Sequence, residues 1–111
     1  MDEQRTDVIQ GTLDMLILNT LRLQDLHGFG IARHIEQVSR GVFKVNPGSL
    51  FTALQRLERG GLVTAEWRES ENARQAKYYA LTRAGKKQLE AESADWARRA
   101  AAVSRLLKAD S

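Results

Sequence analysis

The chain has 111 residues, which is enough for one domain with a modest core and too few for two ordinary domains. Hydrophobic residues make up 42% and charged residues 28%, the balance of a soluble globular protein. Because cysteine is absent, disulfides, thiolate metal sites and cysteine nucleophiles are excluded. The polar, acidic start is unlike a secretory signal, and the apolar run from Met15 to Leu18 is too short to cross a bilayer. We therefore expect a cytoplasmic protein with no membrane partner.

The positive charge is concentrated in the middle of the chain. Residues 28–87 contain eleven Lys and Arg and five acids, a net of 11 − 5 = +6, whereas the rest has six basic and nine acidic residues, a net of 6 − 9 = −3. Many charged stretches are only solvated surface, but a basic segment between mildly acidic ends favours contact with a polyanion.

The first half of the chain predicts three helices. Apolar residues recur at helical spacing from Thr12 to Leu23, and Thr12 is the expected N-cap. A break at residues 27–30 precedes a second helix, which ends near residues 39–41. Pro47 suits the first turn of a third helix, and Gly60-Gly61 ends it. The expected buried face of this third helix consists of Leu50, Ala53, Leu54 and Leu57.

After the glycines the apolar period changes to two, which indicates strands. Residues 62–67 and 77–81 are predicted to form a hairpin around a polar turn at 70–75. Thr82 then caps a last helix from about Arg83 to Leu107. This order predicts a mainly α fold with a small β-hairpin (α+β): a winged helix-turn-helix domain over residues 1–82, followed by a C-terminal helix over 83–111.

The third helix has a second, polar face that suits DNA. Small residues near its start allow close approach of the backbone, and Gln and Arg can contact base edges in the major groove. Wing cations can hold phosphates. The predicted DNA-binding residues are Gly48, Ser49, Thr52, Gln55, Arg56 and Arg59 from the helix, and Arg74 and Lys77 from the wing, with Arg68 a weaker candidate. One of Tyr78 and Tyr79 is expected in the core and the other on the surface.

Four segments resemble PadR-type transcriptional regulators over nearly the whole chain. His27-Gly28-Phe29-Gly30-Ile31 resembles the opening of their second helix, and residues 47–58 resemble their "GSLYPAL-x-RLE" recognition helix. Gly61-Leu62-Val63 and residues 77–85 are similar to the segments that begin and end their wing. Residues 70–72 and Trp96 resemble the short branch often encoded beside transporter permease genes. The resemblance implies transcriptional control, usually repression, by a homodimer on a roughly palindromic operator.

The chain departs from the PadR pattern at two positions of the third helix. Phe51 replaces the more usual Tyr, so a phenolic hydrogen bond to phosphate is lost. Thr52 replaces a frequent Pro, which restores a backbone N–H and adds a hydroxyl. The base contacts of this chain therefore need not match those of its relatives.

The last helix predicts a protein partner independently of the resemblance. A spacing of four and three, typical of a heptad seam, connects Leu89, Ser93, Trp96, Ala100, Val103 and Leu107. We expect dimerisation through Leu89, Trp96, Ala100, Val103 and Leu107, unless the helix folds back on its own domain. The first helix, through Leu13, Ile17 and Leu21, is expected to pack against the partner's last helix, as in the family. Some relatives bind flat aromatic effectors beside a tryptophan, so Trp96 is a candidate ligand residue, although interface packing explains it more simply.

The sequence lacks the patterns of an enzyme or of a cofactor site. His27 and His34 have no converging ligands for a metal, and Ser49 has no adjacent base. The Gly28-x-Gly30 pair follows no strand and has no third glycine, so it is not a dinucleotide-binding motif. The sequence therefore predicts a homodimeric DNA-binding repressor without cofactor or metal. The alternatives are a regulator that responds to an aromatic or drug-like effector and a winged-helix module that binds protein instead of DNA.

Overall fold

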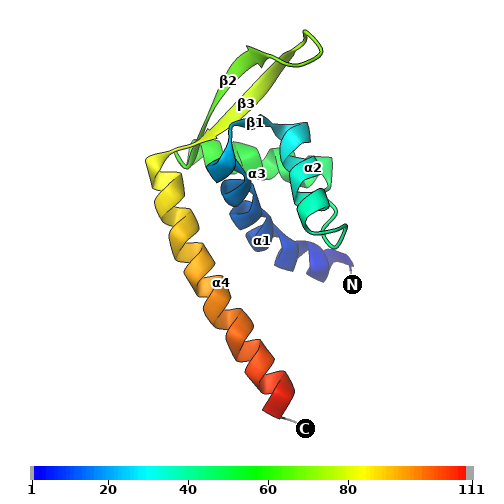
Figure 1. The fold of residues 1–111 in the computed structure, drawn as a ribbon, viewed down its shortest axis with the longest axis vertical. Helices are drawn as coiled ribbons and strands as arrows, with labels where there is room; N and C mark the ends of the chain where they lie inside the picture. The colour runs from blue at the N-terminus through cyan, green and yellow to red at the C-terminus, as the bar shows by residue number, and fades with distance from the viewer. Residues whose placement is uncertain (1, 110–111) are drawn as a thin grey trace.

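The structure, a computed structural model, describes residues 2–109 and the side chains of residues 12–109. Figure 1 shows the first helices grouped together, a small sheet at one end of the group, and a long last helix that leaves it. The elements are α1 (Asp2–Leu23), β1 (Leu26–His27), α2 (Gly28–Val38), α3 (Pro47–Arg59), β2 (Val63–Glu69), β3 (Gln75–Leu81) and α4 (Arg83–Ala109). The predicted α+β winged-helix architecture is confirmed.

The structure corrects two predictions for the first part of the chain: the start of the first helix and the number of strands in the sheet. Helix α1 begins at Asp2, so Thr12 lies inside it and is no N-cap; residues 2–11 contain no proline that would stop a helix. The sheet has three antiparallel strands in the order β1-β3-β2, whereas the sequence predicted only the hairpin of β2 and β3. Strand β1 was missed because it has only two residues and pairs with a distant segment, with Leu26 opposite Tyr79.

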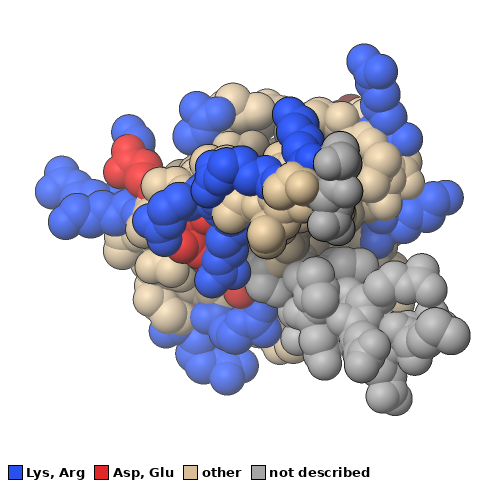
Figure 2. All heavy atoms as spheres, turned by 90° about the horizontal axis from the view of Figure 1, so that it is seen from below, with Lys and Arg blue, Asp and Glu red and all other residues tan. Residues whose placement is uncertain are grey.

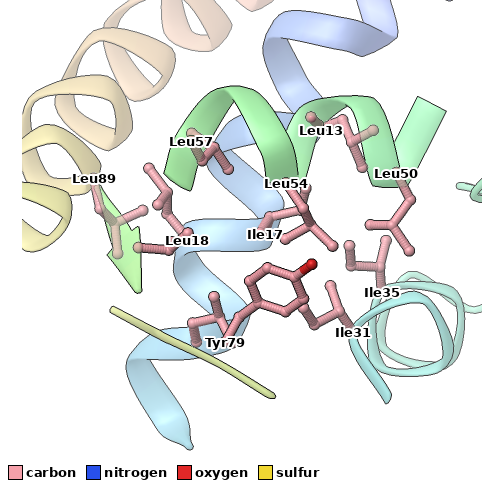
Figure 3. Close-up of a cluster of buried hydrophobic side chains, with 13 residues drawn as sticks. Leu13, Ile17, Leu18, Ile31, Ile35, Leu50, Leu54, Leu57, Tyr79 and Leu89 are labelled. Carbon is pink, nitrogen blue, oxygen red and sulfur yellow. The ribbon is translucent and has the colours of Figure 1, made fainter. Parts of the chain in front are cut away.

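The core lies between α1, α2 and α3 and is closed by side chains from β2, β3 and α4 (Figure 3). The predicted buried face of α3 is confirmed in full. The core is aliphatic except for one ring, and its members are Leu13, Ile17, Leu18, Leu21, Ile31, Ile35, Leu50, Ala53, Leu54, Leu57, Val63, Tyr79 and Leu89. Because α3 buries one face here, its opposite face is held at the surface in a fixed orientation.

The alternation of β3 decides the roles of the two tyrosines. Tyr79 is buried, and this burial raises the pKa of its hydroxyl. Tyr78 points to the other side of the sheet, where its ring meets His27 edge to face, with centroids 5.2 Å apart. The imidazole of His27 also caps α2, because its Nδ1 accepts a hydrogen bond from the Gly30 backbone N–H.

Helix α4 starts at a tight junction with the segment that follows α3. The Thr82 hydroxyl donates to the Gly61 carbonyl (2.7 Å) and accepts from the Gly85 backbone N–H (2.9 Å), so the predicted cap is confirmed. A Cβ on Gly85 would overlap the carbonyl oxygen of Leu62 and crowd the Leu81 side chain. The backbone of α4 therefore lies directly against the chain that enters the wing.

Beyond this junction, most of α4 is uncovered. Its only buried residues in the described part of the chain are Gly85 and Leu89. Leu89 was expected in the dimer seam, but it is 4% exposed and belongs to its own chain's core. The expectation that Leu13, Ile17 and Leu21 reach a partner is wrong for the same reason. Helical periodicity identified the apolar positions but did not distinguish a core within the chain from one between chains.

The junction yields a stability prediction. Gly85→Ala should lower the free energy of unfolding by about 2 kcal/mol or more, because the added methyl displaces α4 from the Leu62 carbonyl. Gly60→Ala is a matched control: Gly60 has a φ of −80°, and its Cβ would lie 3.4 Å from the nearest atom. We expect a change below about 1 kcal/mol for it. Urea unfolding monitored by circular dichroism measures both values; equal losses would contradict the close approach.

Candidate nucleic-acid interface

The amino end of α3 is built to begin sharply at the surface. The Asn46 side chain accepts a hydrogen bond from the Ser49 backbone N–H (3.1 Å), and Pro47 occupies the first helical position. Gly48 follows, exposed and without a side chain, so a bound molecule can approach the backbone closely here. Asn46 was not among the predicted functional residues, although an Asn followed by Pro is a typical start signal of a helix.

The outward face of α3 carries four of the predicted residues side by side. Gly48, Thr52, Gln55 and Arg59 are all exposed, opposite the face that enters the core. They present a hydroxyl, an amide and a guanidinium, which are the groups that read base edges and hold phosphates. The acid of this helix, Glu58, lies on its flank and is paired with Lys77.

Arg56 and Ser49 lie on the other flank of α3, beside this surface. The Arg56 guanidinium donates to the Asp14 carboxylate of α1 at 2.6 Å, and the Arg56 side chain is 48% exposed. Ser49 is half-buried. The sequence could not reveal the Arg56–Asp14 pair, because its members are separated by 42 positions. The pair links α3 to α1, and it engages Arg56 before any ligand arrives.

The wing ends in a tight turn between β2 and β3. The Ser70 backbone N–H donates to the Arg74 carbonyl (2.6 Å), and the Ala73 N–H donates to the Ser70 carbonyl (3.0 Å). Ala73 has a φ of 56°, a left-handed conformation that costs a residue with a side chain about 1–2 kcal/mol. The Arg74 side chain is exposed beside this turn. The turn therefore presents a cation at the far end of the wing.

Two further wing cations are already paired. Lys77 Nζ lies 3.5 Å from a Glu58 carboxylate oxygen of α3 and 5.9 Å from the centre of the Tyr79 ring. Arg68, on the opposite face of the sheet, donates to Glu66 and Asp25, and these hydrogen bonds raise the pKa of its guanidinium. Among the three wing cations predicted from the sequence, Arg74 is thus the one for which the described part of the chain shows no ion pair.

The space beside the start of α3 is a shallow apolar cavity. It measures about 330 Å³ and lies between α2 and α3, with exposed Phe29 and half-exposed Phe51 at its rim. A second cavity, of about 250 Å³, adjoins Asn46 and Ser49 on the side of α1. The Phe51 ring lies 3.5 Å from the position that a Cβ on Gly28 would take. Gly28 therefore leaves room for an aromatic side chain from α3.

Charge alone does not locate the interface. Seen from the end of the molecule opposite the wing, the described part of the surface shows many Lys and Arg side chains at its edge and few acidic ones (Figure 2). What distinguishes the α3–wing side is the combination of exposed α3 polar groups with a neighbouring cationic turn. Among the described residues no group of three or more His, Asp and Glu is arranged to hold a metal ion, and no described helix is long and apolar enough to cross a membrane.

Glu92 is an unusual, half-buried carboxylate on α4. One of its oxygens is buried and has no hydrogen-bond partner among the described residues. Burial raises the pKa of Glu92, a hydrogen bond with the Gln88 side chain offsets part of this increase, and the nearby Asp14 carboxylate raises the pKa further. Asp14 is also the partner of Arg56, so the Glu92 carboxylate lies near the ion pair between α1 and α3.

Residues 17–91 match the family described as the transcriptional regulator PadR-like family. This segment is more than half of the chain and contains α2, α3 and the whole wing. The chain belongs to the PadR-like family. It is therefore a transcriptional regulator and no enzyme.

Individual similar proteins match most of the chain. A transcriptional regulator from Clostridium thermocellum superposes with a TM-score of 0.80 at 25% identity, covering 89% of this chain and 93% of its own. A PadR family transcription regulator from Clostridium difficile gives 0.75 at 29% identity, covering 85% and 96%. An uncharacterized protein of Lysinibacillus sphaericus is 30% identical over 93 residues, 84% of this chain and 85% of its own.

The PadR motifs of the sequence fall at structurally distinct places. The motif of residues 47–58 forms α3, and Gly85, which ends the last motif, is the glycine that lets α4 approach Leu62. Phe51, where the family more often has Tyr, lies against α2 at the cavity rim. The resemblance thus identified the PadR fold and its motifs, but the ion pairs that engage Arg56 and Lys77 required the structure.

The raised pKa of Glu92 makes stability depend on pH. A carboxyl with a raised folded-state pKa opposes folding when ionised; this penalty is present above that pKa and is lost as the pH falls through it. Glu92→Gln should therefore be more stable than the parent at pH 7, and the difference should shrink with acidification and vanish below the ordinary value of 4.5. Thermal unfolding between pH 4 and pH 8 measures it. The exposed control Glu90→Gln should show no such convergence, and a constant difference for Glu92→Gln would contradict the burial argument.

Proposed function

We propose that this PadR-like regulator binds duplex DNA as a homodimer and represses transcription by occupying an operator. The observation that carries the proposal is the orientation of α3: one face is buried in the core, and the opposite face presents Gly48, Thr52, Gln55 and Arg59 to solvent. A helix of this kind fits the major groove, which is about 12 Å wide, and its side chains can distinguish base pairs there. Its membership of a family of transcriptional regulators supports the same conclusion.

Within this proposal the residues differ in what they contact: the bases, the phosphates, or other protein side chains. Thr52, Gln55 and Arg59 face the bases, and the backbone at Gly48 and Ser49 approaches a phosphate at the amino end of the helix. Arg74 holds a phosphate from the wing turn. Arg56 and Lys77 contact DNA only if they leave Asp14 and Glu58, so we assign them supporting positions beside the surface.

The second copy is proposed to pack against α4. This helix has 27 residues, about 40 Å at 1.5 Å per residue, and it extends past the domain on which it starts. Its outer half leaves Trp96, Val103, Leu106 and Leu107 between 50% and 74% exposed. Such an apolar stripe along one helix is typical of an interface between subunits. A two-fold dimer formed here would present two copies of α3 to successive turns of a duplex, about 34 Å apart.

No specific observation favours either of the two alternative functions considered from the sequence, an effector-responsive regulator or a protein-binding module. An aromatic effector at Trp96 needs a pocket, yet the two cavities described above are lined by residues of α1, α2, α3 and the segment between α2 and α3, not by Trp96. A protein-binding module needs no exposed polar α3 face beside a cationic turn. Repression, by contrast, needs only that the dimer cover a site that the transcription machinery must reach.

DNA binding is tested by selecting duplexes from a random pool and titrating salt. Enriched sequences should contain inverted half-sites with centres about ten base pairs apart. Arg74→Ala should weaken binding to every duplex and reduce the slope of log affinity against log salt by about 0.9 for each phosphate that is no longer neutralised. Lys108→Ala removes the same charge at the far end of α4 and should leave the slope unchanged. A pool without enrichment would overturn the proposal, and an unchanged slope for Arg74→Ala would remove the wing from it.

Dimerisation is tested by sedimentation equilibrium on two tryptophan variants. Trp96→Ala removes a large apolar side chain from the α4 stripe and should weaken association at least about tenfold, which corresponds to roughly 1.4 kcal/mol. Trp67→Ala is a matched control, because Trp67 is also exposed but lies on the wing. It should leave the association constant unchanged. Parent-like association of the Trp96 variant would contradict the α4 interface.

A further inference from the structure

Trp67 is a large side chain that the proposed DNA contacts do not use. It lies on β2, it is 66% exposed, and Lys77 of β3 stands directly opposite it. Along β2 the residues of one face become progressively more exposed: Val63 is buried, Ala65 is half-buried and Trp67 is exposed. Trp67 is therefore on the core side of the sheet but beyond the edge of the core.

The neighbours of Trp67 show which way this side of the wing faces. Lys77, its cross-strand partner, reaches the Glu58 carboxylate of α3, so this face of the wing looks toward the carboxyl half of that helix. The other face carries Tyr78 and Arg68, which contact each other and β1 or the residues before it. Trp67 thus lies on the side of the wing that faces α3, in the corner between these two elements.

The chemistry of this corner favours a nucleic-acid backbone as its occupant. The two elements that form it each carry an exposed cation, Arg59 at the end of α3 and Arg74 at the wing turn, whereas Lys77 is paired with Glu58. An indole has an apolar face that packs against a deoxyribose and an N–H that can donate to a phosphate oxygen. If α3 lies in the major groove and the wing turn reaches the adjacent minor groove, the strand between the two grooves passes through this corner.

We propose that Trp67 contacts this strand and contributes a largely non-ionic part of the DNA affinity. The inference rests on the proposed DNA-binding function and adds a residue and a type of contact to it. A non-ionic contact releases no counterions, so removing it lowers affinity without changing the salt dependence. This separates Trp67 from a cation such as Arg74, whose removal changes both.

The affinity test uses an end-labelled duplex from the selected pool and fluorescence anisotropy. Trp67→Ala is expected to lower affinity about tenfold at every salt concentration, which gives a line parallel to that of the parent. Trp67→Phe keeps an aromatic ring and should recover most of the affinity. Binding by Trp67→Ala at parental affinity, or a flattened salt slope, would overturn the inference. Sedimentation of the same variant confirms that the dimer is intact.

A direct readout comes from the tryptophan itself. The chain has two tryptophans, so Trp67 is the single emitter in a Trp96→Phe background. Its emission should shift to shorter wavelength or be quenched as the duplex saturates the protein, because the exposed indole becomes covered. Unchanged emission at a saturation shown by anisotropy would overturn the Trp67 contact and leave DNA binding standing. A parent chain that binds no duplex would overturn both proposals.

Discussion

The arrangement of the whole molecule depends on one backbone contact, the approach of Gly85 to the Leu62 carbonyl. Three parts of the chain meet there: the end of α3, the return of the wing, and the start of α4. The Thr82 hydroxyl joins them by bonding to both Gly61 and Gly85. Since any side chain at residue 85 would separate these parts, the glycine sets the angle between the helix proposed to contact DNA and the helix proposed to bind the second copy.

A second constraint acts within the domain and concerns which cations remain available. The chain is basic, yet Arg56, Lys77 and Arg68 are each held by a carboxylate from another element or strand position. These exposed pairs contribute little to stability individually. Their effect is mainly to orient the side chains and to leave Arg59 and Arg74 as the cations that face the proposed duplex. The proposed DNA-contacting surface therefore contains fewer available cations than the total number of Lys and Arg residues suggests.

The sequence allowed the elements and the buried face of α3 to be predicted, because helical and strand periodicities are local properties of a chain. Thr82 as a cap was recognisable for the same reason. Apart from the misplaced start of α1, the errors concern relations between distant segments. Strand β1 exists only because β3 lies beside it, and Leu89 continues the spacing of a subunit interface although it fills its own core. The Arg56–Asp14 pair likewise depends on the packing of α3 against α1, which no local pattern encodes.

The exposed length of α4 has a mechanical consequence. Its buried residues in the described chain are Gly85 and Leu89, so the helix acts as a lever whose pivot lies near these two residues. From Leu89 to Leu107 the lever measures about 27 Å, and tilting it by about 10° would move its tip by roughly 5 Å. A displacement of that size exceeds the rise between neighbouring base pairs. In the proposed dimer, small rearrangements around the pivot would therefore be amplified into a mismatch between the two subunits and the pitch of the double helix.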